Sequence, residues 1–201
     1  MKINQTKQKV VEAASSLFFQ KGFHGTSVRD IAEYASVNVS LISYYFNSKQ
    51  GLLEYAVTNY YEMYLTIVNE EITNNEHIHP IEKLKKVIYA IIQYKTDYFQ
   101  LTSFINRELS LDSTFVREMT VTYLAKENHV LSELFFPILS KENKKQRFYL
   151  YMQLKGMLMS PYMLKNEWNN QMVDQQSFRH FIKNYVKTID QWIDFIADKD
   201  K

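Results

Sequence analysis

The sequence contains no cysteine, only four glycines and three prolines. The missing cysteine excludes disulfides, thiolate catalysis and cysteine-ligated zinc. So few helix-breaking residues, with few β-branched alternations, predict an all-α chain. No segment approaches 18 uninterrupted apolar residues, and the first residues lack the apolar stretch of a signal peptide. We therefore expect a cytoplasmic protein with no membrane partner.

Basic and acidic residues are nearly equal in number, 24 against 22, which gives a formal net charge of +2. Such a small excess creates no strong basic field that would by itself indicate nucleic acid. The whole excess lies within residues 1–55, and the remainder of the chain is neutral. The electrostatics therefore permit DNA binding by the N-terminal segment without requiring it.

Hydrophobic residues make up 46% of the chain and aromatic residues 15%, which is enough for a full core. Helical spacing of the apolar positions recurs along the whole sequence. Gly22 is expected to end the first helix in a left-handed conformation. Helices are expected at about 6–21, 28–35, 39–46 and 49–74, from residue 80 onward, and at about 100–110, 113–139, 146–165 and 176–197.

The stretch from Thr26 to Lys49 predicts two short helices joined by a tight turn. Ser27 can cap the first helix, and Asp30 can reach back to the cap. Asn38 is a good cap for the second helix. The outward face of that helix is predicted to carry hydroxyls, an amide and an aromatic ring but no carboxylate: Ser40, Ser43, Tyr44 and Asn47.

This outward face suits a groove lined by phosphates, and a helix-turn-helix places such a second helix in the major groove of DNA. Any helical hairpin has a polar outer face, however, so the periodicity alone leaves DNA binding open.

The same stretch resembles the signature of the TetR family of bacterial DNA-binding regulators. The matching positions are Thr26, Arg29, Ile31, Ala32, Val37, Asn38, Tyr45, Phe46, Ser48 and Lys49. The resemblance implies a three-helix helix-turn-helix head at residues 1–48 and a C-terminal helical bundle for regulation and dimerisation at residues 49–201. Two positions depart from the family pattern: Ser36 replaces the turn glycine, and Ser43 replaces a tyrosine that contacts phosphate.

Sequence-specific binding would follow from the side chains of the two short helices. Arg29 is the best candidate for reading a guanine, and Val39 or Leu41 could contact a thymine methyl group. Phosphate contacts, which set register, are expected from Thr26, Ser27, Tyr45 and Lys49. The complete predicted DNA-binding set is Thr26, Ser27, Arg29, Asn38, Val39, Ser40, Leu41, Ser43, Tyr44, Tyr45 and Lys49.

A homodimer follows because one recognition helix contacts only a few base pairs, whereas two modules one helical turn apart recognise a palindrome. Residues 148–164 are apolar nearly all round, and the last helix has a strong apolar stripe. The predicted dimer interface comprises Met152, Gly156, Met159, Met163, Ile189, Trp192 and Ile196.

Regulation leaves alternatives open. Tyr, Phe and Met residues between positions 84 and 164 could line a pocket for a small apolar effector, or fill the core of the bundle. Two Arg-Glu pairs, Arg107-Glu108 and Arg117-Glu118, could form a partner or ligand surface, or ion pairs between helices.

Residues 37–46 and 107–118 also resemble a division-linked member of the TetR family from spore-forming bacilli. This second resemblance implies a DNA-bound regulator of cell division that acts through a division protein rather than on transcription.

An enzyme is the least favoured class. The sequence shows no metal-ligand spacing and no glycine loop for phosphates. We therefore expect no enzymatic activity, no cofactor and no metal. The favoured function is a nucleoid-associated repressor that binds a palindromic operator as a homodimer.

Overall fold

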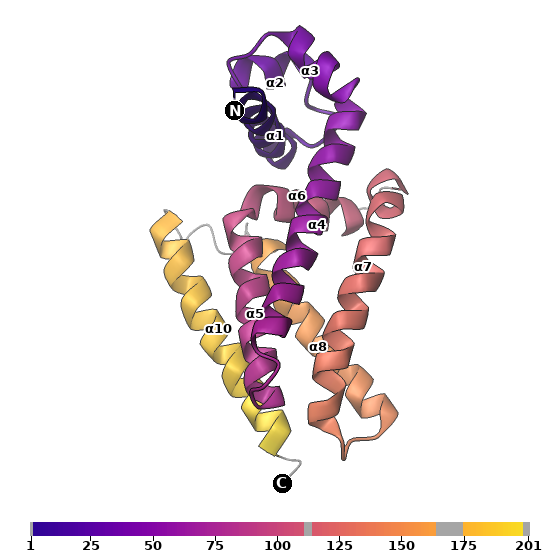
Figure 1. Cartoon of the computed structure of the whole chain (residues 1–201), viewed down its shortest axis with the longest axis vertical. Coiled ribbons are helices and arrows are strands. Elements are labelled where there is room, and N and C mark those ends of the chain that lie inside the picture. Colours follow the sequence, from indigo (N-terminus) through magenta and orange to yellow (C-terminus); the bar gives the residue numbers. More distant parts are fainter. Residues whose placement is uncertain (1, 111–113, 164–174, 199–201) are drawn as a thin grey trace. The chain divides into compact units, whose positions relative to one another are not determined.

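In the computed structural model, which describes residues 2–110, 114–163 and 175–198, every element is helical (Figure 1). The prediction of an all-α chain is confirmed. No helix in these ranges has the length and apolar character of a membrane span. The elements are α1 (Lys2–Lys21), α2 (Val28–Tyr34), α3 (Val39–Phe46), α4 (Lys49–Asn74), α5 (Pro80–Asp97), α6 (Phe99–Ser110), α7 (Thr114–Phe135), the 3-10 turn η1 (Phe136–Leu139), α8 (Lys144–Met163) and α10 (Gln175–Asp198).

Two expected helices differ from the observed ones. α1 begins at Lys2, four residues before the predicted start. The long helix expected at 113–139 ends as α7 at Phe135 and continues as η1, which contains Pro137. Proline lacks the backbone N–H that a regular α-helix requires and clashes with the preceding turn, so the helix tightens there. The expected ends at 113 and 164–165 lie outside the described residues.

The chain divides into two compact units. Unit 1 comprises residues 1–63 and 98–121, and unit 2 comprises residues 64–97 and 122–201. This division differs from the predicted boundary between residues 48 and 49. The first part of α4 and all of α6 group with α1–α3.

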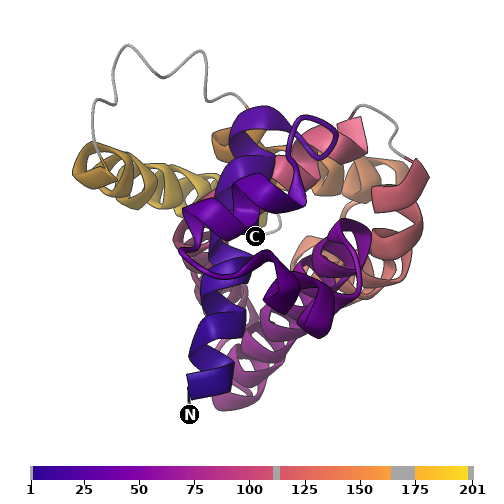
Figure 2. The same cartoon turned by 90° about the horizontal axis from the view of Figure 1, so that it is seen from above.

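The core of unit 1 lies between α1, α2, α3, the first half of α4 and α6. Val10, Ala14, Leu17 and Phe18 of α1 are buried, and Phe18 packs against Phe104 of α6 with ring centroids 5.5 Å apart. On α3, Ile42 and Phe46 point into this core. Helix α2 contacts both α1 and α3, and this packing fixes the orientation of α3 with respect to α1. Figure 2 shows α1–α3 from above.

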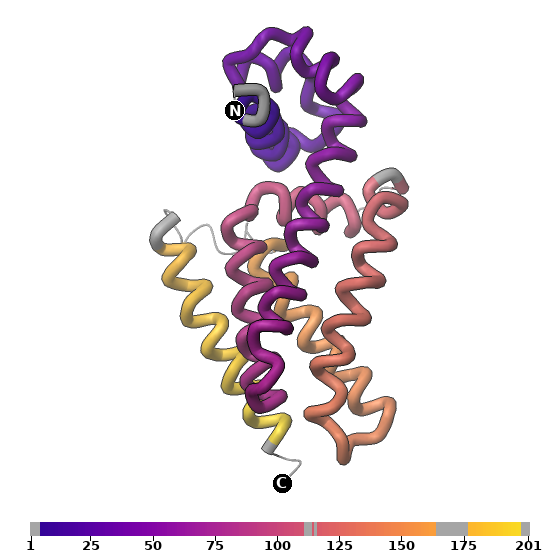
Figure 3. The backbone as a smooth tube through the Cα atoms, viewed as in Figure 1, coloured from indigo at the N-terminus to yellow at the C-terminus, as the bar shows by residue number. Residues whose placement is uncertain are grey.

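In unit 2, α5 and α10 run side by side and both contact η1 (Figure 3). Their apolar stripes meet in the core, where Ile88 and Ile193 have no exposed surface. Phe135 at the end of α7 stacks on Trp192 of α10 at 6.0 Å. The apolar face of α10 therefore packs against α5, η1 and the end of α7 within unit 2.

Candidate nucleic-acid interface and dimer surface

The first short helix begins with a reciprocal cap. The Ser27 backbone N–H donates to Asp30 Oδ2 at 2.8 Å, and the Asp30 N–H donates to Ser27 Oγ at 3.1 Å. The predicted capping box is confirmed. The bonds from the Ser27 backbone and then its side chain lower the pKa of Asp30, so the carboxylate stays charged at the helix N-terminus.

The turn between α2 and α3 contains a strained residue. Ser36 has a φ of 54°, in the left-handed region where a side chain costs free energy. Ser36 is the residue that replaces the glycine of the family pattern. Asn38 then caps α3 as predicted, because its Oδ1 accepts from the Ser40 N–H at 2.9 Å and the Ser40 hydroxyl at 2.8 Å.

The outward face of α3 is uncharged and contains an unusually exposed aromatic ring. Tyr44 is 79% exposed. Val39, Ser40, Ser43 and Asn47 are also exposed, whereas Leu41 and Tyr45 are half-buried. The outward orientation predicted for the polar residues is confirmed. This face can approach a DNA groove without a carboxylate repelling the phosphates.

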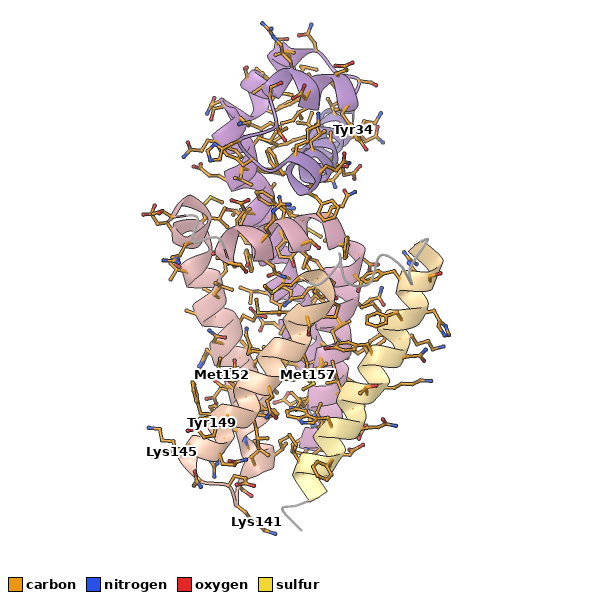
Figure 4. The ribbon with its side chains drawn as sticks, turned by 180° about the vertical axis from the view of Figure 1, so that it is seen from behind. Tyr34, Lys141, Lys145, Tyr149, Met152 and Met157 are labelled. Atoms are coloured by element: carbon orange, nitrogen blue, oxygen red, sulfur yellow. The ribbon has the colours of Figure 1, made fainter. Side chains whose placement is uncertain are left out.

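Two further side chains extend the exposed surface. Arg29 on α2 is exposed and forms no hydrogen bond or salt bridge with any residue in the described ranges, so its guanidinium is available. Tyr34, labelled in Figure 4, is exposed, and its hydroxyl accepts from Ser16 at 3.3 Å. The sequence interpretation missed Tyr34, although its position outside the apolar stripe of α2 indicated exposure.

Thr26 and Lys49 are not available as predicted. Thr26 is only 1% exposed, and its hydroxyl donates to the Gly22 carbonyl at 2.8 Å. Lys49 Nζ donates to the carbonyls of Phe23 and Thr26, both at 2.8 Å, and lies 4.3 Å from the centre of the Phe23 ring. The structure contradicts the prediction that these two side chains contact phosphate, because both are bonded to the segment between α1 and α2.

Arg107 on α6 also bonds inside unit 1. Its Nη2 donates to the Phe18 carbonyl at 2.8 Å, and its Nη1 donates to the Phe19 carbonyl at 3.0 Å. These carbonyls end α1, where a cation is favourable. Arg107 and Lys49 together hold residues 18–26, which we call the α1–α2 corner. The assignment of Arg107 to a partner or ligand surface is therefore corrected.

The other members of that predicted surface lie in varied environments. Glu108 is largely buried, with its carboxylate 3.9 Å from Arg107 Nε. Arg117 and Glu118 are exposed on α7. A partner or ligand surface at Arg117 and Glu118 stays a prediction.

The predicted dimer interface divides into exposed and buried residues. Met152 is 55% exposed, Gly156 and Met163 are exposed, and Met159 is half-buried. Space beside Gly156 is open, with no atom of the described residues within 4 Å of a Cβ built there. These positions form one exposed row along α8, and Figure 4 shows Tyr149 and Met152 on one side of this helix.

The α10 part of the prediction is corrected. Ile189 and Ile196 are buried within unit 2, and Trp192 is partly covered by Phe135. Side chains that are buried within a single chain have no surface left for a partner. Phe148 and Tyr149 on α8, which the sequence interpretation missed, are more than half exposed instead.

Comparisons with known proteins agree with this arrangement. The model of the family described as "Bacterial regulatory proteins, tetR family" matches residues 10–56, which include the whole helix-turn-helix. The "Probable HTH-type transcriptional regulator YttP" of Bacillus subtilis (strain 168) is 40% identical over 200 residues, covering 96% of this chain and 94% of the relative.

Two other similarities are more distant. The "Biofilm operon icaADBC HTH-type negative transcriptional regulator IcaR" of Staphylococcus aureus (strain Newman) is 26% identical, covering 48% of this chain and 54% of that protein. The fatty acid degradation regulator FadR from Bacillus halodurans has the same fold, with a TM-score of 0.68, 19% identity and coverage of 92% of this chain and 94% of that chain.

The narrower resemblance to the division-linked family member, RefZ, stays a prediction. The family itself follows from the match to the helix-turn-helix and from the extent of the similarity to YttP. The chain belongs to the tetR family of bacterial regulatory proteins and is a DNA-binding transcriptional regulator.

Proposed function

We propose that the protein is a transcriptional repressor that binds a palindromic operator as a homodimer. The observation that carries this proposal is the exposed, uncharged face of α3, together with the exposed Arg29 of α2, whose guanidinium has no partner among the described residues. A face of this kind can enter a major groove and donate hydrogen bonds to base edges.

Within this face the side chains have different roles. Arg29 can donate two hydrogen bonds to the O6 and N7 atoms of guanine, and the exposed Val39 can contact a thymine methyl group. Tyr44 and Ser43 offer hydroxyls to bases or phosphates. Ser27 is exposed, and its hydroxyl, which accepts from the Asp30 N–H, can still donate a hydrogen bond to a phosphate oxygen. The predicted phosphate role of Tyr45 is limited to its hydroxyl, because its ring packs against Tyr44 and Phe46.

Dimerisation is proposed through the exposed row of α8. Phe148, Tyr149, Met152 and Met163 present large apolar side chains to solvent. Gly156 lies within the row, and its lack of a side chain lets a partner helix approach closely. Burying this row against a second copy would remove the apolar surface from water.

Repression is the simplest consequence of operator binding at a promoter, because the bound dimer blocks access by RNA polymerase. The regulator IcaR, which shares the family's DNA-binding region, has a name that describes a negative regulator. A protein of this kind would act in the cytoplasm, on the nucleoid.

The DNA-binding role is tested with operator fragments recovered by genome-wide binding. Arg29→Ala should lose about 1–3 kcal/mol of binding free energy and accept more sequences at one position of each half-site. Arg179→Ala on α10, an exposed arginine of unit 2, is the matched control and should bind as the wild type does. Unchanged affinity and preference in Arg29→Ala at constant salt would refute the assignment.

The dimer is tested by light scattering at micromolar concentration. The wild type should have twice the mass of one chain, and Met152→Glu should shift the mass towards the monomer because it places a carboxylate in an apolar contact. Thr122→Glu on the exposed side of α7 should stay dimeric. A monomeric wild type would contradict the proposal.

The same operator fragments distinguish repression from the division-linked alternative. Derepression of adjacent genes when the protein is removed supports a repressor. Sites at fixed chromosomal positions whose neighbouring genes keep the same expression would support a DNA-bound regulator of cell division and contradict repression.

A further inference from the structure

The first turns of α1 contain a lysine that lies against two aromatic rings of unit 1. Lys7 Nζ is 3.8 Å from the centre of the Tyr55 ring on α4 and 5.5 Å from the centre of the Phe46 ring on α3. The two rings contact each other, with centroids 5.3 Å apart. An ammonium group within about 6 Å of a ring centre is attracted by the negative face of the ring. Lys7 therefore joins α1 to both α3 and α4, and we call these three residues the Lys7 cluster.

The Lys7 cluster lies at the C-terminal end of α3. Phe46 is the last residue of that helix, and Asn47 follows it with a φ of 63°. The last carbonyls of a helix lack partners within the helix and carry partial negative charge, so a cation near them is favourable. The last turn of α3 contains no basic residue of its own. Lys7 of α1 brings a cation to this end of the helix.

Ring contacts connect the Lys7 cluster with the exposed face of α3. Phe46 contacts Tyr45 with centroids 6.2 Å apart, and Tyr45 contacts Tyr44 at 5.2 Å. Tyr44 is the 79% exposed ring of that face. A helix of eight residues is too short to keep its orientation without tertiary packing. A shift of Phe46 would therefore move the side chains that approach DNA.

The position of Lys7 favours this internal role over a contact with a phosphate. Its side chain is half-buried, and its charge lies over the two rings. Lys9, only two residues along α1, is exposed and lies over no ring in the part of the chain that the structure describes. The two lysines therefore have the same charge and nearly the same place in the sequence, but only Lys7 contacts α3 and α4. Lys9 provides a matched control.

We propose that Lys7 is a positioning residue for DNA recognition, which orients α3 through Phe46 and Tyr55 and contacts neither a base nor a phosphate itself. Base edges are recognised only when α3 is correctly oriented in the groove, whereas non-specific binding depends mainly on phosphate contacts. Lys7 therefore determines sequence preference rather than general affinity for DNA. The inference rests on the proposed role of α3 in DNA binding.

Fluorescence anisotropy of the full chain with two DNA fragments tests this inference. One is an operator fragment recovered by genome-wide binding, and the other has the same length and composition in a scrambled order. Lys7→Met keeps an unbranched side chain without the charge, so operator affinity should fall by about threefold to tenfold. Affinity for the scrambled fragment and the salt slope should stay as in the wild type. Lys9→Met should leave the ratio of the two affinities unchanged.

Further variants test whether the rings carry the effect. Lys7→Arg should recover most of the operator affinity, because a guanidinium also stacks on aromatic faces. Tyr55→Leu should lower operator affinity selectively, whereas Tyr55→Phe keeps the ring and should bind as the wild type does. The double variant of Lys7→Met and Tyr55→Leu should lose less than the product of the two single losses, because both changes remove the same contact.

Three outcomes would overturn the proposal. An equal loss for both fragments in Lys7→Met, with a salt slope reduced by about 0.9, would show that Lys7 contacts a phosphate directly. A preference that Lys7→Met keeps in full would overturn the inference alone. A wild type without any preference for the operator fragment would overturn the role of α3 as well. Helical circular dichroism at the assay temperature checks that each variant is folded, so that unfolding of unit 1 is not mistaken for a reoriented α3.

Discussion

Arg107 provides a sharp test of how unit 1 holds its DNA-binding helices. Its guanidinium joins α6 to the last carbonyls of α1, and α2 packs directly on α1. Replacing Arg107 with methionine keeps an unbranched side chain but removes both hydrogen bonds. We expect the α1–α2 corner to loosen, so that α2 and α3 adopt the binding orientation less often.

The size of the effect follows from the contacts. A hydrogen bond to a charged group contributes about 1.5–3 kcal/mol when buried. The Arg107 side chain is 40% exposed, so solvent reduces this contribution. The Phe18 carbonyl also accepts from the Gly22 N–H at 2.9 Å and stays bonded in the variant. We therefore expect unit 1 to lose about 1–2 kcal/mol, which limits the loss of operator affinity to a factor of about 5–30.

Fluorescence anisotropy with an operator fragment, over a series of salt concentrations, measures this loss. Arg107→Met should bind more weakly with the salt slope of the wild type, because no phosphate contact is removed. Arg107→Lys should recover part of the affinity, and the exposed Arg179→Met should behave as the wild type. A slope reduced by about 0.9 would show that Arg107 contacts DNA directly and would refute the reasoning.

Three further predictions concern stability. Lys49→Met should lower the free energy of unfolding by about 2 kcal/mol in a urea titration, with an unchanged salt slope for operator binding, because Lys49 bonds to carbonyls rather than phosphates. Ser36→Gly should raise the Tm, because glycine adopts the left-handed conformation without the cost of about 1 kcal/mol that a side chain adds. Burial raises the pKa of Glu127 on α7, but Lys95 and Lys155 beside its carboxylate outweigh burial and lower the pKa from an ordinary 4.5 to about 2. Its contribution of about 3 kcal/mol should therefore be present above about pH 4.5 and lost as the pH falls towards 2. Glu127→Gln should flatten that part of a stability–pH curve, and an unchanged curve would refute the ion-pair account.

The local features of the head could be predicted from sequence because their partners are near in the chain. The Ser27–Asp30 box spans three residues, and the Asn38 cap spans two. Gly22 adopts a φ of 75°, as its place after α1 predicted. Such short-range bonds depend on residue type and spacing, both of which the sequence displays.

The misassigned residues bond to partners far along the chain. Lys49 contacts the Phe23 carbonyl 26 residues away, and Arg107 contacts the Phe18 carbonyl 89 residues away. Both bonds depend on how the helices pack, which residue spacing does not determine. A cation near a DNA-binding motif resembles a phosphate contact until its internal partner is known.

The dimer interface could also be predicted only in part, because the burial of its apolar residues depends on how the helices pack. Periodicity correctly placed Ile189 and Ile196 on one stripe of α10, but it could not show that this stripe is covered within unit 2. The exposed row of α8 was predicted only in part, because that helix is apolar nearly all round. Glu127 accepts hydrogen bonds from Lys95 and Tyr64, which lie 32 and 63 positions away, and no local pattern indicated these contacts.

The central claim is that α2 and α3 bind specific DNA sequences. Genome-wide mapping of binding sites for the tagged wild type, beside the tagged Arg29→Ala variant, tests this claim most directly. We predict a limited set of sites that share an inverted repeat with half-sites about one helical turn apart, and that are depleted in the variant. Binding without any shared sequence, or an identical set of sites in the variant, would contradict it.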